Sequence, residues 1–321
     1  MMRARDFTVD IVSAQYPCGA AWLANALLEL SVPLPHLWGF DTRDEWDISG
    51  VGEWRYVASQ LPWRQTLASL RLGRTFRFRD EIRPRFSHSF PFELSRSPHI
   101  VLVVRDPRDC LYSEWRRQRQ NLGLPKSMTF EDFLEHPFFG GPISMVDMLW
   151  LHFHSWLAYR RMRPEEVYVL RFEDWKRDDI GQLRDIARWF GLSPTNEELE
   201  RATEASAVKH LRTVEEQLLA VDPGARQFNR SGTPEEWRST WKSAWLPLLG
   251  EQWNNVFAEL GYVRAPHAQS GSSRAPLDLG KILDWRGVVD PEVRTDWSKL
   301  LACEHICFDA VHDQVSRDAR G

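Results

Sequence analysis

Short β-rich segments that lead directly into helices constrain the fold of this chain most strongly. Residues 8–14 are mostly apolar, a turn follows at Pro17 and Gly19, and residues 20–30 are rich in Ala and Leu, which favour a helix. Residues 99–104 hold five consecutive apolar residues and lead to Pro107, which suits the first turn of a helix. Residues 166–170 repeat the pattern before a helical spacing that ends at Gly191. This alternation predicts an α/β fold, with a parallel sheet flanked by helices.

Composition excludes several classes of protein. A formal net charge of −4 over 321 residues gives no general attraction to nucleic acid or to an anionic membrane. No segment approaches the roughly 18 apolar residues of a membrane span, and the first residues lack the apolar stretch of an export signal. Cys18, Cys110, Cys303 and Cys307 are too few and too scattered for a disulfide framework. We therefore expect a cytoplasmic protein without a membrane partner.

The domain organisation is predicted from one change in composition. Residues 265–276 are rich in Ser, Gly, Ala and Pro and are typical of a linker. They separate a main domain, residues 1–264, from a tail, residues 277–321, to which the sequence assigns no role. The tail contains Cys303, His305, Cys307 and His312, but this spacing is not that of a zinc ribbon. We expect no metal.

Two features of the main domain suit phosphate binding. The strand, glycine turn and helix around Gly19 form a phosphoryl-binding, P-loop-like layout that offers backbone N–H groups to an anion. It lacks the Gly-Lys-Ser/Thr of a Walker A loop, so a P-loop kinase is disfavoured. Arg105 ends a buried strand and Ser113 lies two helical turns later, an arrangement in which a guanidinium and a hydroxyl can hold a phosphate monoester. A surface ion pair is the alternative interpretation of Arg105.

Several motifs in one order resemble the sulfotransferases that use 3′-phosphoadenosine-5′-phosphosulfate (PAPS). Tyr16 to Leu23 stands where that family has Tyr-Pro-Lys-Ser-Gly-Thr-Thr-Trp, and Arg105 with Ser113 has the spacing of its 3′-phosphate motif. Further matches lie at residues 86–88 (family Lys-Thr-His), 129–134, 169–176 (a strand, then Tyr-Glu-Asp) and 230–232 with Trp237. The resemblance covers about residues 8–263.

The resemblance implies a nucleotide-dependent transferase. Such enzymes move a sulfuryl group from PAPS to a hydroxyl or amine of a small organic acceptor, leave 3′-phosphoadenosine-5′-phosphate (PAP), and need no metal. His88 takes the place of the family's catalytic base, and an imidazole with a pKa near 6.5 suits that task. The residues implied in nucleotide binding are Pro17, Cys18, Gly19, Ala20, Ala21 and Trp22 in the loop, Arg105, Ser113, Arg230, Ser231 and Gly232 around the 3′-phosphate, and Phe172 near the adenine.

The phosphosulfate loop departs from the family pattern. It is one residue shorter, Cys18 is nearest the missing lysine, and Ala20 and Ala21 replace both threonines. Phe86 also replaces the lysine of Lys-Thr-His. Losing one donor to the developing charge commonly costs about 100- to 1000-fold in rate. Either another cation compensates, with Arg85 or an arginine of residues 71–79 as candidates, or the protein binds PAP and PAPS with little or no catalysis.

The acceptor is not identified by the sequence. Its pocket is expected from residues 31–66, residues 86–92 and the helix after Pro142. The 16 tryptophans of the chain suit either a Trp-rich core or a pocket for a flat ligand. Candidate walls are Trp38, Phe40, Trp46, Trp54, Phe90 and Phe139. Residues 238–247 lack the family's dimerisation segment, so the oligomeric state stays open.

Overall fold

The protein is built on a four-stranded parallel sheet. The structure, a computed structural model, describes residues 7–32, 82–91, 99–121, 123–221, 232–263 and 277–288, with Pro291 and Arg294. Its strands are β1 (Phe7–Ser13), β2 (Ile82–Ser87), β3 (His99–Val104) and β4 (Val167–Arg171). They lie in the order β2-β1-β3-β4, and every pairing is parallel. The predicted fold class is confirmed.

The strand register brings the carboxyl ends of β1, β2 and β3 to one edge of the sheet. Val12 pairs with Ser87 of β2 and with Leu102 of β3, so the residues that follow these strands are neighbours. Strand β2 contains Pro84, which cannot donate to a ladder and is therefore tolerated on an outer strand. The sequence predicted β1, β3 and β4 but not β2.

Helices follow the strands or pack beside them. The chain forms α1 (Ala20–Glu29), α3 (Pro107–Asn121), α4 (Phe130–Glu135), α5 (Met145–Met162), α6 (Phe172–Arg177), α7 (Asp179–Trp189), α8 (Asn196–Ala205), α9 (Val208–Val221), α10 (Trp237–Thr240), α11 (Trp253–Glu259) and α12 (Leu279–Trp285), with 3₁₀ turns at Phe138–Gly140 and Ser243–Leu249. Five of the described helix starts are set by side-chain caps that accept a hydrogen bond from the third backbone N–H of the helix, as capping residues do: Thr129, Ser144, Asp178, Thr195 and Asp278.

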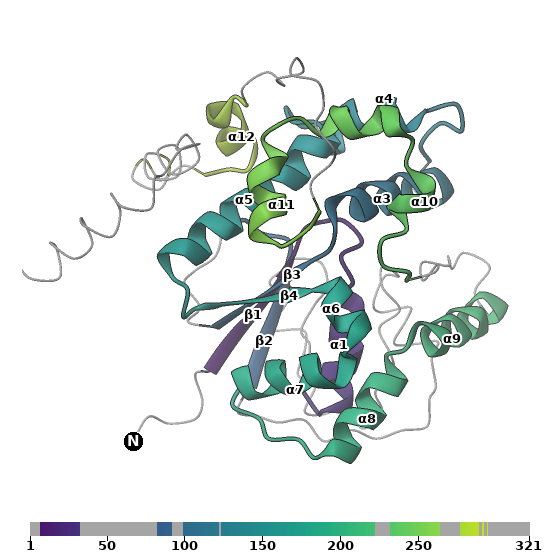
Figure 1. The fold of residues 1–321 in the computed structure, drawn as a ribbon, viewed down its shortest axis with the longest axis vertical. Helices are drawn as coiled ribbons and strands as arrows, with labels where there is room; N and C mark the ends of the chain where they lie inside the picture. The colour runs from purple at the N-terminus through teal and green to yellow at the C-terminus, as the bar shows by residue number, and fades with distance from the viewer. Residues whose placement is uncertain are drawn as a thin grey trace, which may run out of the picture.

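The core lies between the sheet and these helices. Figure 1 shows the strands between a group formed by α1, α6, α7 and α8 and a second group that includes α5 and α11. Helix α5 is buried from Met145 to Ala158, which explains why its sequence is mostly apolar around the helix. Helix α12 joins the same core through Ile282, so residues 277–288 pack against the main domain. No helix among the described residues is long and apolar enough to cross a membrane.

Candidate cofactor and active site

The turn between β1 and α1 has the geometry of an anion-binding loop. Gly19 has φ +93°, and a Cβ there would lie 2.4 Å from Cδ2 of Phe172, so both backbone conformation and space require glycine. The Cys18 N–H donates to the Tyr16 carbonyl at 2.7 Å and the Trp22 N–H donates to the Gly19 carbonyl at 3.0 Å. The Trp22 amide is therefore already engaged. Of the four amides predicted to bind the phosphate, those of Gly19, Ala20 and Ala21 remain candidates.

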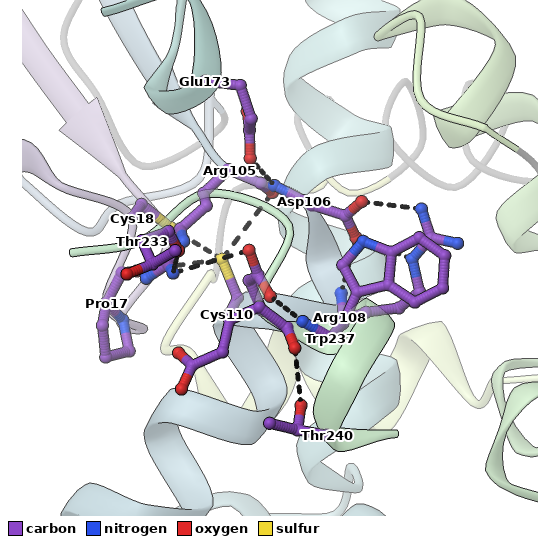
Figure 2. Close-up of polar contacts among 12 residues, drawn as sticks. Pro17, Cys18, Arg105, Asp106, Arg108, Cys110, Glu173, Thr233, Trp237 and Thr240 are labelled. Atoms are coloured by element: carbon purple, nitrogen blue, oxygen red, sulfur yellow. Dashed lines mark hydrogen bonds and ion pairs between the residues drawn. The ribbon is translucent and has the colours of Figure 1, made fainter. Parts of the chain in front are cut away.

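Arg105 joins three segments that are distant in the sequence. Arg105 is 5% exposed, and its guanidinium donates to the carbonyls of Pro17 at 3.3 Å and Thr233 at 3.1 Å, as Figure 2 shows. It also lies 3.5 Å from Asp109 Oδ2. The predicted phosphosulfate loop, the 3′-phosphate motif and the segment after Gly232 therefore meet at one side chain.

Asp109 reduces the positive charge at this junction. Its carboxylate accepts a hydrogen bond from the Trp237 N–H at 2.8 Å, which fixes the start of α10 against α3. Burial raises the pKa of Asp109 to about 6, although Arg105 pulls it down. A buried acid with this pKa is partly neutral near pH 6, so Arg105 keeps more net charge for a phosphate than a fully ionised partner would leave it.

The two aromatic residues predicted near the adenine lie together. Trp22 and Phe172 have ring centroids 4.9 Å apart, and a Cβ on Gly232 would lie 2.2 Å from Cη2 of Trp22. Lys176 Nζ lies 3.9 Å above the Trp22 ring. The rings touch, so a purine cannot lie between them unless they separate. The structure thus brings the two residues together, and their contact with adenine stays a prediction.

His88 follows β2 and lies beside the end of β1 because Val12 pairs with Ser87. Its Nδ1 is 2.9 Å from the Ser13 carbonyl oxygen. A carbonyl only accepts, so this nitrogen carries the proton and Nε2 keeps its lone pair. Burial lowers the pKa of His88, and Arg117 and Arg286 lower it further. His88 is therefore neutral at pH 7, the form that a general base requires.

Cys18 and Phe86, which stand at the positions of the family lysines, are both buried. The Cys18 thiol is 1% exposed and lies 3.5 Å from the Cys110 sulfur, and Phe86 is 6% exposed. The Phe86 ring packs edge-on against His88 with centroids 5.4 Å apart. Neither position offers a cation, so charge compensation has to come from other side chains.

Next to Arg105, a polar network that the sequence analysis did not identify holds the end of β3. Glu173 accepts from the Asp106 N–H at 2.9 Å and from the Tyr262 hydroxyl at 2.8 Å. Arg108 pairs with Asp106 at 2.6 Å and lies 3.5 Å above the Trp237 ring. In the sequence, the alternating charges of residues 105–109 were the feature that could have indicated this network. A pocket of about 380 Å³ next to this network is lined by Asp106, Arg108, Arg171, Glu173, Lys176, Arg177, Pro234, Glu235, Gly261, Tyr262 and Val263.

The family is decided by a match over more than half of the chain. The sequence model described as "Sulfotransferase domain" matches residues 69–257. The chain belongs to the sulfotransferase family. This matched span holds His88, Arg105, Ser113 and Phe172, and the resemblance inferred from the motifs is confirmed.

Individual relatives are distant from this sulfotransferase-family chain. Cytosolic sulfotransferase 3 of Arabidopsis thaliana is 22% identical over 182 residues, covering 54% of this chain and 56% of the relative. Human sulfotransferase 1C2 is 25% identical over 149 residues, covering 44% of this chain and 48% of the relative. The chain thus spans about half the length of these curated relatives.

Solved structures agree with the fold. Mouse sulfotransferase SULT7A1 complexed with PAP superposes with TM-score 0.50 at 19% identity, covering 80% of this chain and 84% of that chain. Retinol dehydratase in a complex with retinol and PAP superposes with TM-score 0.51 at 17% identity, covering 86% and 85%. At these identities the likeness supports the α/β sulfotransferase fold alone.

The remaining predicted site residues fall into two groups. Phe90 is fully buried, Ser113 is half-buried on α3, and Phe139 is 60% exposed with its ring against Phe138, so Phe139 lies at the surface rather than in an enclosed pocket. The others lie outside the described residues: Trp38, Phe40, Trp46, Trp54, Arg230, Ser231, the side chain of Arg85 and residues 71–79. Their roles stay predictions.

Proposed function

We propose that this protein transfers a sulfuryl group from PAPS to a hydroxyl or amine of a small organic acceptor. The observation that carries the proposal is the hydrogen bond of His88 Nδ1 to the Ser13 carbonyl at 2.9 Å. That bond fixes the ring tautomer and leaves Nε2 as the base, and it stabilises the ring after Nε2 takes a proton.

The residues of the nucleotide site fit PAPS by two observations. The Nε atom of Arg105 is buried without a hydrogen-bond partner among the described residues, so one donor is available to a phosphate oxygen. The missing Cβ atoms of Gly19 and Gly232 let Phe172 and Trp22 pack directly against the backbone of the two segments, which places both proposed adenine contacts beside the loop. PAPS, when bound, supplies the sulfuryl group and a phosphate leaving group.

Each group of side chains then has a separate role in the reaction. His88 removes the acceptor proton at Nε2, while the amides of Gly19, Ala20 and Ala21 at the start of α1 stabilise negative charge on the leaving phosphate. Arg105 and Ser113 hold the 3′-phosphate, and Trp22 and Phe172 contact the adenine. Tyr16 anchors the loop by donating to the Met145 carbonyl at 2.5 Å.

A PAP- or PAPS-binding protein with little catalysis is the second candidate. It is favoured by the buried, uncharged side chains of Cys18 and Phe86 at the positions of the family lysines. The first candidate is favoured by the cations that act on His88, Arg117 and Arg286, because a cation near the base can replace a lost lysine.

Calorimetric titration of PAP tests the nucleotide site. PAP is expected to bind the wild type and Arg188→Ala, whose side chain is 68% exposed, and to lose binding in Arg105→Ala, with ATP ignored by all three. Absence of PAP binding to the wild type would reduce the assignment to a statement about fold.

Transfer of label from ³⁵S-PAPS to an acceptor panel separates the two candidates. His88→Gln should lower transfer by about 100- to 10,000-fold and leave PAP affinity unchanged. PAP binding without measurable transfer by the wild type would favour the binding protein.

A further inference from the structure

Helix α12 brings a cation from outside the matched family domain to the side of His88. The family match ends at residue 257, and Arg286 is the C-cap of α12. The helix is held in place by Ile282 and Leu283, each 2% exposed, and it lies near α5 and α11 (Figure 1). Residues 277–288 therefore lie beside the candidate active site.

The contacts of α12 fix the direction of Arg286. The neighbouring Trp285 packs on Phe138, with centroids 6.3 Å apart, and a Cβ on Gly141 would lie 2.6 Å from its ring. The Arg286 guanidinium carbon lies 5.1 Å from the centroid of Phe90, which is two residues beyond His88. The guanidinium thus faces the segment that carries the base.

His152 also packs against Phe90. It projects from α5 with 2% of its surface exposed, and its ring centroid is 5.5 Å from that of Phe90. Neither ring nitrogen makes a hydrogen bond of normal geometry among the described residues. The nearby Ser89 backbone raises the pKa of His152 slightly against the larger effect of burial, but the Ser89 carbonyl already accepts from the Trp156 indole N–H at 3.0 Å. A buried imidazole without partners is costly in a folded protein and calls for an explanation.

The charges that act on this pair are cationic. Burial, with smaller effects of His88 and Arg286, lowers the pKa of His152 to about 3. Arg117 and Arg286 also lower the pKa of His88. Arg117 is paired with Glu114 on its own helix. The groups with the largest effects on these two pKa values include no carboxylate, and surroundings of this kind favour an anion.

We propose that Arg286 and His152 bind an anionic group of the acceptor, such as a carboxylate, beside the hydroxyl or amine that is sulfated. The inference rests on the proposed function, because it places the acceptor next to His88. It names a substrate class, acidic acceptors. A guanidinium and an imidazole N–H are suited donors to a carboxylate.

An anionic acceptor would also improve the base. Arg117 and Arg286 weaken the proton affinity of His88, and a negative charge between the imidazoles offsets that effect. An acidic acceptor would therefore restore the proton affinity that His88 needs when it takes the proton, whereas a neutral one would not.

Histidine-detected NMR tests the inference on the full chain with saturating PAP. Ring-labelled histidine gives separate signals, and His88→Asn and His152→Asn assign two of them. Benzoate is the anionic probe and benzyl alcohol its neutral match. Benzoate is expected to shift both signals to saturation, and benzyl alcohol is expected to leave them in place.

Three variants identify the cation. Arg286→Gln should weaken benzoate binding at least about tenfold, as expected for loss of a charged hydrogen bond. Lys281→Gln, which removes one charge from the exposed face of the same helix, should bind like the wild type. Arg286→Lys keeps charge and stem and should recover most of the binding, which separates loss of charge from loss of packing.

Unmoved signals at tens of millimolar benzoate, equal shifts by benzyl alcohol, or wild-type binding in Arg286→Gln would each overturn the inference. The titration of PAP is independent of benzoate. A protein that binds PAP but fails these tests keeps the proposed function and loses only the acidic acceptor.

Discussion

The contact between Gly19 and Phe172 yields a prediction whose size follows from the structure. Gly19→Ala forces a side chain into the left-handed region at φ +93° and places its Cβ 2.4 Å from Cδ2 of Phe172, which is 3% exposed. The backbone strain costs about 1–2 kcal/mol, and overpacking against a buried ring adds about 1–3 kcal/mol. The free energy of unfolding should therefore fall by about 2–5 kcal/mol.

Gly191→Ala is the matched control. Gly191 has φ +73°, and a Cβ there would meet nothing within 4 Å, so this change carries the backbone strain alone. The assay is urea unfolding followed by tryptophan fluorescence, with PAP affinity measured in parallel. The reasoning is refuted if the two substitutions destabilise the protein equally.

A double-mutant cycle isolates the steric part of the effect. Phe172→Leu removes the ring that a Cβ on Gly19 would strike, so Gly19→Ala should cost less in the Phe172→Leu background than in the wild type. The interaction free energy from the cycle should fall at about 1–3 kcal/mol, within the range for residues in contact. Strict additivity would show that the ring is not the obstacle.

Two further predictions concern the network around Arg105. Burial raises the pKa of Asp109 from 3.8 to about 6; the folded state therefore binds more protons between these values, and stability from this group is lost as pH rises from about 4 to 6. Relative to Asp109→Asn, the wild type should lose about 2–3 kcal/mol over that window, which urea unfolding at several pH values would detect. Arg108→Ala leaves Asp106 buried without its partner at 2.6 Å and uncovers Trp237, so it should cost about 3–5 kcal/mol. Arg188→Ala, at a 68% exposed side chain, should change unfolding by less than about 1 kcal/mol, and equal effects would contradict the argument.

Local sequence signals were sufficient for much of the fold. The apolar runs at β1, β3 and β4, the turn at Gly19 and the end of α7 at Gly191 each depend on chemistry within a few residues. Strand β2 was not predicted because its sequence, with Pro84 and two arginines, lacks the apolar pattern of a strand. Its place at the sheet edge makes it one, since an outer strand needs only one partner.

The candidate site was predictable only where a motif carried it. The order of the motifs pointed to His88, Arg105 and Ser113, and the structure brings Arg105 together with the loop and with the segment after Gly232. The network of Glu173 and Tyr262 with Asp106 was not foreseen, because its members come from three separate segments.

The sequence by itself determined the family and the parallel α/β architecture, since periodicity and motif order are properties of contiguous residues. Only the tertiary structure decided the tautomer of His88, because that depends on the register of β1 against β2. The tertiary structure alone also decided which side chains surround His88. His152 and Arg286 stand 134 residues apart in the chain and both lie against Phe90 because α5 and α12 pack into one core, and no local pattern encodes such an arrangement.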